Sequence, residues 1–364
     1  MGDYHTIAEP EKTDESRQPM GKMRKSSTKR QRNLQEALED AQTQLESGLI
    51  QGGVLATLEQ EPVAFGWQTV NPKKTAMTTE SRFDIASVGK VFTASCCASL
   101  VIEGKLDPDA PFTEYLPEHI LGKNCDITVR NLATHSGGFA NARHYGAKNP
   151  KDFYSDLMAS RPIRPRGSAF EYSCYGFILL GLILNRLTGK DLDTLAREIV
   201  WGPLGMTHTT WNAPGPGPNE VEHWHPNRPA GEHNDDMCHR VNVPLGSGSC
   251  FSTCGDMMVF VRDMIERRCF PNAYYDLLTT CCWEGCTTPA VPGMLARRSF
   301  GWDMCDLRRP KTFSRHAIFY SGFTGQTIAV DPARGFGAII MTSRVGDWEE
   351  ANQARVRLID TLCR

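Results

Sequence analysis

A serine and a lysine stand three residues apart at the start of an apolar stretch, at Ser87 and Lys90. If a helix begins near Ala86, their side chains lie one turn apart on the same face. A serine hydroxyl is a weak nucleophile at neutral pH, but a lysine whose pKa is lowered by burial or by nearby cations can take its proton. The spacing therefore predicts a nucleophile and a base on one helix. The same spacing also occurs at Ser26 and Lys29, beside a basic run, so other segments have to support it.

A tyrosine precedes a second apolar stretch that carries glycines, at Tyr172. A phenol close to a lysine ammonium has a lowered pKa and can relay the proton of the nucleophile to a leaving group. A tyrosine that only packs, with its hydroxyl satisfied, is the alternative.

The segment 318–326 ends one strand and turns into another. Gly322 in that turn lets a substrate approach the backbone closely. An amide there can pair with the Ser87 amide as an oxyanion hole, which polarises a carbonyl as negative charge develops. An ordinary hairpin with two turn glycines is the alternative.

A polar segment from 232 to 256 is expected to form a loop at the rim of the substrate cleft. Near its end, Ser252 or Thr253 is expected to cap a helix that begins near Gly255. Several acids and histidines lie in and just before this segment. Their spacing matches neither a pair of histidines four residues apart on a helix nor a recognised metal-binding loop, so we expect no metal site and no cofactor. They are His223, His225, His233, Asp235, Asp236 and His239.

The elements that must position these groups follow from periodicity and from turn residues. Helical spacing and a glycine stop predict helices over 34–45, 87–104, 129–134, 176–188, 191–200 and 347–362. Strand-prone runs predict strands over 52–58, 63–67, 299–305, 314–320, 326–330 and 337–342.

Strands at both ends of the chain and helices between them predict an α+β fold. We expect an antiparallel sheet, flanked by the first and last helices, with a large and mostly helical inserted subdomain. Residues 34–104 and 291–364 would form the sheet subdomain, and residues 105–290 the helical one, with the site in the cleft between them. Residues 1–33, which include a basic run, are expected to be a disordered charged tail.

The composition excludes several classes of protein. A net charge of −2 gives no electrostatic case for binding nucleic acid. No apolar run is long enough for a transmembrane segment, and the first residues lack an apolar secretory core, so we expect a cytoplasmic protein. The thirteen cysteines are then expected to be reduced thiols. The cluster at 281–286 lacks the paired spacing of a zinc site.

Five segments in this order resemble motifs of the serine β-lactamase and penicillin-binding-protein superfamily: 83–90, 127–138, 172–181, 202–207 and 320–325. The resemblance covers residues 36 to 364 and is closest to the esterases, D-amino-acid peptidases and acyltransferases that have the fold of AmpC-type β-lactamases. It implies a two-step acyl transfer in which Ser87 is the nucleophile, Lys90 the base and Tyr172 the group that assists proton movement. The amides of Ser87 and Phe323 would form the oxyanion hole.

Two motifs depart from the pattern of that superfamily. Cys174 replaces the asparagine of its usual Tyr-x-Asn motif, and Tyr320 replaces the lysine or histidine before Ser321 and Gly322. The resemblance makes these four positions substrate-binding. A thiol is a weak substitute for an amide, and a phenol lacks the cation that would attract a substrate carboxylate. Both changes disfavour β-lactams and D-Ala-D-Ala peptides, which carry that carboxylate.

We therefore expect a serine hydrolase or acyltransferase of the esterase kind. Its partners would be a small ester, thioester or amide and an alcohol or amine acceptor. A D-amino-acid peptidase or β-lactamase is the second hypothesis. A non-catalytic binding protein that retains the fold is the third, because a fold alone does not establish a function.

Overall fold

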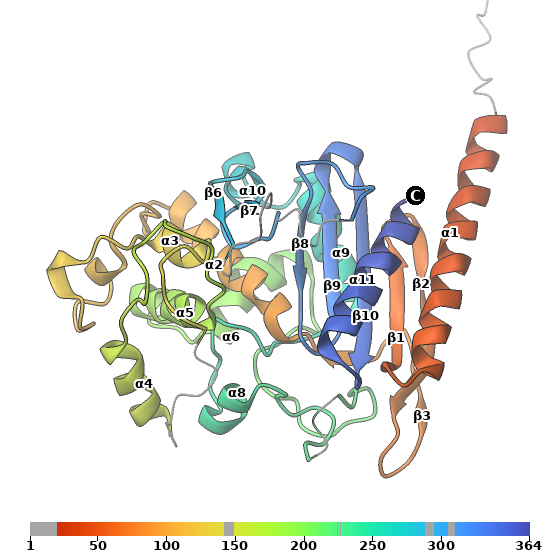
Figure 1. Ribbon diagram of the computed structural model, residues 1–364, viewed down its shortest axis with the longest axis horizontal. Coiled ribbons are helices and arrows are strands. Elements are labelled where there is room, and N and C mark those ends of the chain that lie inside the picture. Colours follow the sequence, from red (N-terminus) through yellow and green to blue (C-terminus); the bar gives the residue numbers. More distant parts are fainter. Residues whose placement is uncertain (1–19, 142–148, 224, 226, 288–294, 305–309) are drawn as a thin grey trace, which may run out of the picture.

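The structure is a computed structural model that describes residues 20–141, 149–223, 225, 227–287, 295–304 and 310–364, with the backbone alone over 20–28. Segments from the two ends of the chain meet in one antiparallel sheet (Figure 1). Its strands, in spatial order, are β3 (Thr75–Ala76), β2 (Gln60–Thr69), β1 (Ile50–Thr57), β10 (Phe336–Arg344), β9 (Gln326–Asp331) and β8 (Ile318–Ser321). The pairing of β1 with β10 places Val54 opposite Met341 and joins the N-terminal hairpin to the C-terminal strands.

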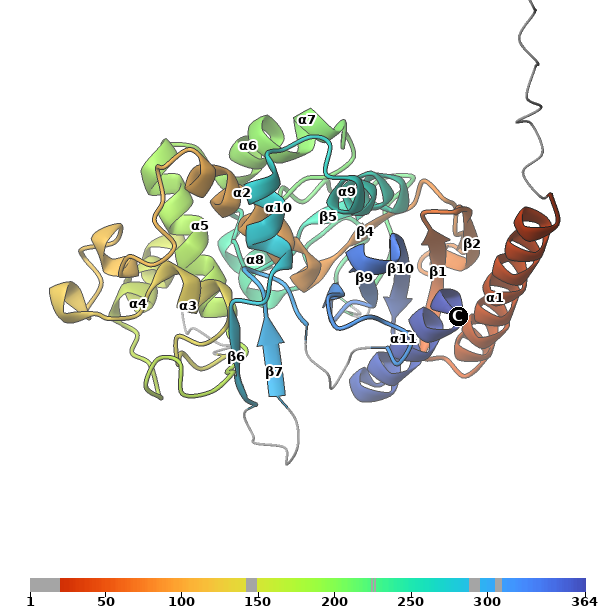
Figure 2. The same ribbon diagram turned by 90° about the horizontal axis from the view of Figure 1, so that it is seen from above.

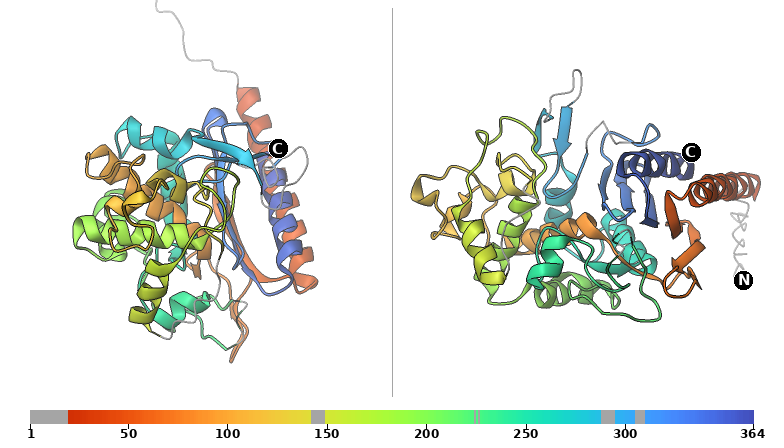
Figure 3. Two further views of the ribbon diagram at one scale, coloured as in Figure 1. Left: turned by 60° about the vertical axis from the view of Figure 1, so that its left-hand side comes forward. Right: turned by 60° about the horizontal axis from the view of Figure 1, so that its bottom comes forward.

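Helices cover both faces of this sheet because its strands alternate apolar side chains between the two faces. Leu55 and Ile340 face α1 (Met20–Glu46) and α11 (Trp348–Cys363), which lie side by side in Figures 2 and 3. The neighbouring residues of the same strands belong to a second and larger core, which also includes α9 (Cys254–Glu266). The antiparallel sheet flanked by the terminal helices, and with it the α+β class, is confirmed.

The remaining helices form most of the other half of the molecule (Figure 1). They are α2 (Lys90–Ile102), α3 (Val129–Ala133), α4 (Pro150–Ala159), α5 (Cys174–Thr188), α6 (Leu192–Ala196), α7 (Gly202–Leu204), α8 (Asp236–Val241) and α10 (Asn272–Thr279). Two short strand pairs complete the fold: β4 (Arg82–Asp84) with β5 (Phe251–Thr253), and β6 (Trp283–Cys286) with β7 (Leu295–Arg298). No helix within the described ranges is long and apolar enough to cross a membrane.

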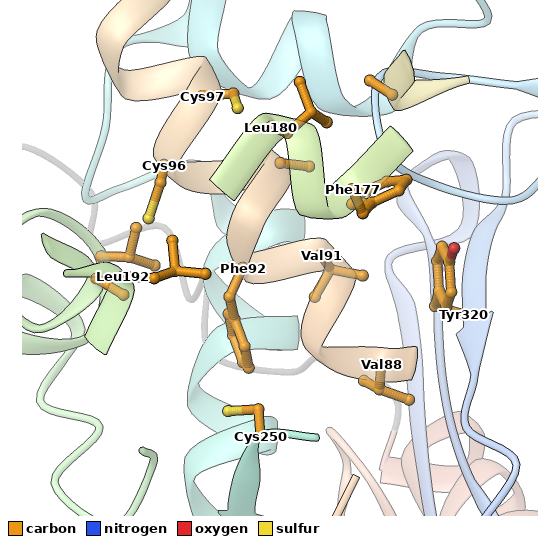
Figure 4. Close-up of a cluster of buried hydrophobic side chains, with 14 of the residues drawn as sticks. Val88, Val91, Phe92, Cys96, Cys97, Phe177, Leu180, Leu192, Cys250 and Tyr320 are labelled. Carbon is orange, nitrogen blue, oxygen red and sulfur yellow. The ribbon is translucent and has the colours of Figure 1, made fainter. Parts of the chain in front are cut away.

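Helix α2 runs through the centre of the larger core. Figure 4 shows Val91 and Phe92 of this helix among side chains that include Phe177 and Leu180 of α5. Phe92 also meets Trp201 edge to face, with the ring centroids 5.5 Å apart. Because α2 is enclosed in this way, the residues at its N-terminus have fixed positions relative to both halves of the molecule.

Several predicted elements are found close to their expected bounds. The helices expected over 129–134 and 176–188 are α3 and α5, and the expected hairpin is β1 with β2. The Thr253 side chain accepts a hydrogen bond from the Asp256 backbone N–H and caps α9, as predicted. Asp347 caps α11 in the same way, by accepting from the Glu350 N–H.

Three expectations about the elements are wrong. Residues 20–33 of the expected disordered tail belong to α1, because the lysines, arginines and methionines there are good helix formers that continue the apolar helix after them. The strand expected over 299–305 lies earlier, as β7, because Gly301 has a φ of +87° that ends the extended backbone. Helices α4, α7, α8 and α10 have no counterpart among the expected elements.

The subdomain boundaries stay a prediction. Strands β6 and β7 lie on opposite sides of the expected boundary at 290/291 and pair with each other. The cysteines that the structure describes are free thiols, most of them buried. Residues 1–19 of the expected tail lie outside the described residues.

Candidate active site

Ser87 lies in a 3₁₀ turn, Ala86–Gly89, which leads directly into α2. A 3₁₀ turn has three residues per turn, so the side chains at positions 87 and 90 are stacked along one face. The Lys90 Nζ lies 3.0 Å from the Ser87 Oγ. The predicted pairing of the two residues therefore exists, on a turn that is tighter than the expected α-helix. Ala86, just before the serine, has a φ of +44°, which few residues other than glycine adopt.

Lys90 is fully buried and its ammonium is surrounded by acceptors. Besides the Ser87 Oγ, its Nζ donates to the Cys174 Sγ at 3.5 Å and to the backbone carbonyl of Ser247. A lysine ammonium has three N–H donors, and these contacts use all three. Lys90 is thus held in one position beside the serine hydroxyl.

Tyr172 is the third member of the group. Its hydroxyl donates to the Ser87 Oγ at 2.7 Å, and its ring centroid lies 5.1 Å from the Lys90 Nζ. Burial raises the pKa of the Tyr172 phenol well above its usual range, while the hydrogen bond with Ser87 and the charge of Arg298 lower it. Ser173, which follows Tyr172, is held in place by its backbone N–H, which donates to the Nδ1 of His135 at 3.1 Å. The structure thus places the Lys90 side-chain nitrogen and the Tyr172 phenol within hydrogen-bond distance of the Ser87 Oγ.

The turn that carries Gly322 packs directly on the turn that carries the serine. The Thr324 Oγ1 donates to the backbone carbonyl of Asp84 at 2.8 Å. A Cβ at Gly322 would lie 2.5 Å from the carbonyl oxygen of Ile85, so only glycine permits this approach. Arg355 of α11 donates to the Gly322 carbonyl at 2.5 Å and so connects this turn to α11. Phe323, the predicted donor of the second oxyanion-hole amide, therefore lies in a turn fixed against the serine turn.

The four predicted substrate-binding positions have different exposures. Cys174 and Ser321 are half-buried, and the Ser321 Oγ is 2.9 Å from the Oγ1 of Thr327. Tyr320 is only 4% exposed, and its hydroxyl lies 3.0 Å from the Nε2 of His135. Its phenol consequently faces the interior of the protein in this structure.

The histidines and acids that the sequence offered as a metal set have other partners. His223 accepts a hydrogen bond from the Asp84 N–H at 3.1 Å. Asp235 caps α8, and His225 and His239 lie within 4 Å of Asp236 and Glu232, respectively. Across the described ranges, no three histidine, cysteine, aspartate or glutamate side chains are grouped as a metal site requires.

Asp84 links the serine turn to the polar loop. Its carboxylate accepts from the N–H of Ala86 at 2.9 Å and from the N–H of Asn234 at 2.7 Å. Burial raises the pKa of Asp84, and the two hydrogen bonds lower it. Burial has the larger effect, so the pKa rises from its ordinary 3.8 to about 7. A buried carboxyl thus holds the loop against the segment that precedes Ser87.

This carboxyl predicts a pH-dependent stability. The native state binds its proton more tightly than the unfolded chain does, so the stabilisation is complete below about pH 4 and is lost as the pH rises through about 7. Asp84→Asn cannot ionise, so we expect a smaller difference between its unfolding temperatures at pH 5 and pH 8 than in the native chain. Thermal unfolding followed by circular dichroism measures both differences, and equal differences would contradict the assignment.

Sequence reasoning missed several residues that support the site: Asp84, His135, Ser247, Arg298 and Arg355. Three of them lie in segments that were noticed: Asp84 in the motif 83–90, His135 in the motif 127–138 and Ser247 in the glycine-bearing part of the polar loop. For Arg298 and Arg355 the sequence offers no signal, because their roles depend on strand and helix packing between distant segments.

Comparisons with known proteins agree with this geometry. A family model described as Beta-lactamase matches residues 34–361. The D-alanyl-D-alanine-carboxypeptidase/endopeptidase AmpH of Escherichia coli K12 is 25% identical over 280 residues, which span 71% of this chain and 70% of that protein.

Solved structures share the fold at low sequence identity. A class C β-lactamase is 16% identical, with a TM-score of 0.73, over 92% of this chain and 98% of its own. EstCE1, described as a hydrolase with promiscuous acyltransferase activity, is 17% identical, with a TM-score of 0.71, over 92% of this chain and 99% of its own. At these identities the two structures establish a common architecture and nothing about the substrate of this chain.

Proposed function

The chain belongs to the Beta-lactamase family, and from this premise we propose that it is a serine hydrolase that transfers acyl groups through an acyl-enzyme on Ser87. The observation that carries the proposal is the placement of one serine oxygen 3.0 Å from an amine and 2.7 Å from a phenol. This arrangement gives the nucleophile a base and a proton relay without any further group.

In the first step the Ser87 Oγ attacks an ester, thioester or amide carbonyl while Lys90 acts as the base that takes the hydroxyl proton. The new Oγ–C bond forms as the carbonyl π electrons move to oxygen, and the amides of Ser87 and Phe323 stabilise that oxyanion. The oxyanion then collapses, the bond to the leaving group breaks, and Tyr172 donates its proton to the departing atom and regains one from Lys90. Water, or an alcohol or amine acceptor, releases the acyl group by the reverse sequence.

The substrate we propose is a small ester, thioester or amide without a carboxylate at the position that β-lactams and D-Ala-D-Ala peptides present. Cys174 beside Lys90 and the buried Tyr320 support this choice, since neither offers a surface cation. EstCE1, whose description combines hydrolase and acyltransferase activity, supports the acyl-transfer step of the proposal and not the choice of substrate. The D-amino-acid peptidase hypothesis is favoured by the similarity to AmpH. The cytoplasmic location stays a prediction.

A labelling experiment tests the acyl-enzyme. The native chain, incubated with a fluorophosphonate, is expected to gain one adduct in intact mass, and peptide mapping is expected to place it on Ser87. The other serines are internal controls, among them Ser26, which stands three residues before Lys29 in the sequence. An unmodified chain, or an adduct spread over several serines, would leave the binding-protein hypothesis as the better one.

The fate of the acyl group separates the remaining hypotheses. With p-nitrophenyl butyrate as donor, we expect p-nitrophenol release to accelerate on addition of a small alcohol or amine, with the acylated acceptor found by mass spectrometry. An unchanged rate with butyrate as the product would identify a hydrolase. Faster turnover of nitrocefin or of a D-Ala-D-Ala peptide than of the ester would favour the peptidase or β-lactamase hypothesis.

A further inference from the structure

Arg298, the last residue of β7, is a buried cation next to the candidate site. Only 1% of the residue is exposed. Its Nη1 lies 3.2 Å from the Oδ2 of Asp303, while its Nε and Nη2 have no hydrogen-bond partner among the described residues. Asp303 compensates the charge, but a buried guanidinium with two unpartnered nitrogen atoms is still costly, so its presence calls for a role other than packing.

The guanidinium is enclosed by aromatic rings that lead to Tyr172. It lies 5.4 Å from the ring centroid of Phe170 and 5.5 Å from that of Tyr320. The Tyr320 hydroxyl meets the Nε2 of His135, whose ring centroid is 4.7 Å from that of Tyr172. Arg298, Tyr320 and His135 therefore form a layer that packs against Tyr172.

His135 is neutral in this layer. Burial, together with the charges of Arg298 and Lys90, holds the pKa of His135 well below its usual range. Its Nδ1 accepts from the Ser173 N–H, so the ring proton is on Nε2 and is donated to the Tyr320 hydroxyl. The histidine consequently orients Tyr320 and adds no charge.

The charges around Tyr172 can be assigned element by element. The ionisable groups that act on Tyr172 or on the layer are Lys90 of α2, Cys174 of α5, His135, Tyr320 of β8, Arg298 of β7, and Asp303 and Cys282 beside Arg298. Among them only Lys90 and Arg298 are cations, and Lys90 changes its protonation during the proposed reaction. A guanidinium keeps its charge at every working pH.

We propose that Arg298 is a positioning residue that supplies, from β7, the fixed positive charge that the triplet Tyr320-Ser321-Gly322 lacks. The charge stabilises Tyr172 when it has given up its proton and keeps the Lys90–Tyr172 pair able to accept the serine proton near neutral pH. Its burial means that it acts across Tyr320 and without contact with substrate. This inference rests on the proposed function.

The test is the pH profile of kcat/KM for p-nitrophenyl butyrate. The acidic limb of this profile belongs to the Lys90–Tyr172 pair as a whole. Removing the charge in Arg298→Gln is expected to move the limb upward by about one pH unit and to lower kcat/KM at pH 7 about tenfold, with recovery at higher pH. Arg298→Lys retains the charge and is expected to keep the limb near its native position.

A second variant, with the opposite expected shift of the acidic limb, keeps the test decisive if Arg298→Gln does not fold. Asp303→Asn leaves the charge of Arg298 uncompensated and is expected to move the acidic limb downward. Arg297→Gln is the matched control, since Arg297 is the adjacent buried arginine of β7 and pairs with Glu284 away from the site. Circular dichroism and fluorophosphonate titration confirm that each variant is folded and count its reactive sites.

The outcomes separate this inference from the proposed function. Opposite shifts for Arg298→Gln and Asp303→Asn support it. A pH-independent loss in folded Arg298→Gln, or no shift in Asp303→Asn should Arg298→Gln fail to fold, would overturn it. A native chain that forms no serine adduct would overturn the proposed function before either variant is compared.

Discussion

Ser87→Ala is expected to abolish the burst of p-nitrophenol and to lower the acylation rate at least about 10⁴-fold, as loss of a catalytic serine does elsewhere. Lys90 and Tyr172 both donate to the Ser87 Oγ, so its loss removes the oxygen atom on which the base and the phenol act. Stopped-flow measurement of p-nitrophenyl butyrate cleavage gives the rate. Reacting sites counted by fluorophosphonate titration should fall to none.

The control is Ser99→Ala, on the same helix. The Ser99 Oγ donates to the Ser95 carbonyl at 3.2 Å, well away from the site. Both variants lose one hydroxyl from α2 or the turn before it, so both are expected to unfold within about 4 °C of the native chain. Retention of more than a hundredth of the native acylation rate in Ser87→Ala, with Ser99→Ala fully active, would contradict the nucleophile assignment.

Local signals predicted the parts of the site that lie close together in the chain. The three-residue spacing of Ser87 and Lys90 placed them on one face, and this holds because a helical turn of either kind stacks such positions. Thr253 was expected to cap the following helix, and it does, since a short oxygen side chain satisfies the first free N–H groups of a helix. Each of these inferences depends on a few consecutive residues.

The resemblance to a family extended the prediction to a residue far away in the sequence. Tyr172 lies 85 residues from Ser87, and no periodicity could have paired their hydroxyl groups. The ordered motifs supplied that relation, whereas the sheet built from both ends of the chain was predicted from the strand-prone runs at each end. The motifs also gave Tyr320 a substrate-binding place, whereas the structure turns its phenol toward His135. A motif gives the position of a residue in the backbone, and the surrounding packing decides the direction of its side chain.

Groups that act through the packing of distant segments could not be predicted. The carbonyl of Ser247 reaches Lys90 across 157 residues, and any residue type could have provided it, since every residue has a backbone carbonyl. Arg298 is one of many arginines in the sequence, and it is buried near the site through Asp303, which forms isolated bridges to Arg298 of β7 and to Phe319 of β8. The helical segment 20–33 was missed for a different reason, because a basic run without acids is typical of both a tail and an exposed helix.

Lys90→Met is expected to lower the acylation rate about 10³-fold, which is the usual contribution of a general base. Methionine is unbranched and fills a volume close to that of lysine, so the packing of α2 is retained. Stability is expected to stay or to rise: within the part of the chain that the structure describes, the buried ammonium has no ion-pair partner, and its contacts are uncharged groups. A fall in activity with an unchanged or higher unfolding temperature separates catalysis from folding.

The matched control is Lys105→Met, just beyond the end of α2, where the lysine forms an exposed ion pair with Glu103 at 2.6 Å. Its loss is expected to change neither the rate nor the unfolding temperature, since exposed pairs contribute little. Burst kinetics with p-nitrophenyl butyrate and thermal unfolding measure both variants. If Lys90→Met kept more than a tenth of the native acylation rate, this result would identify Tyr172 as the base in place of Lys90. Lys90 would then only hold the phenol and the serine in place, and the fixed charge of Arg298 would matter more to the first step.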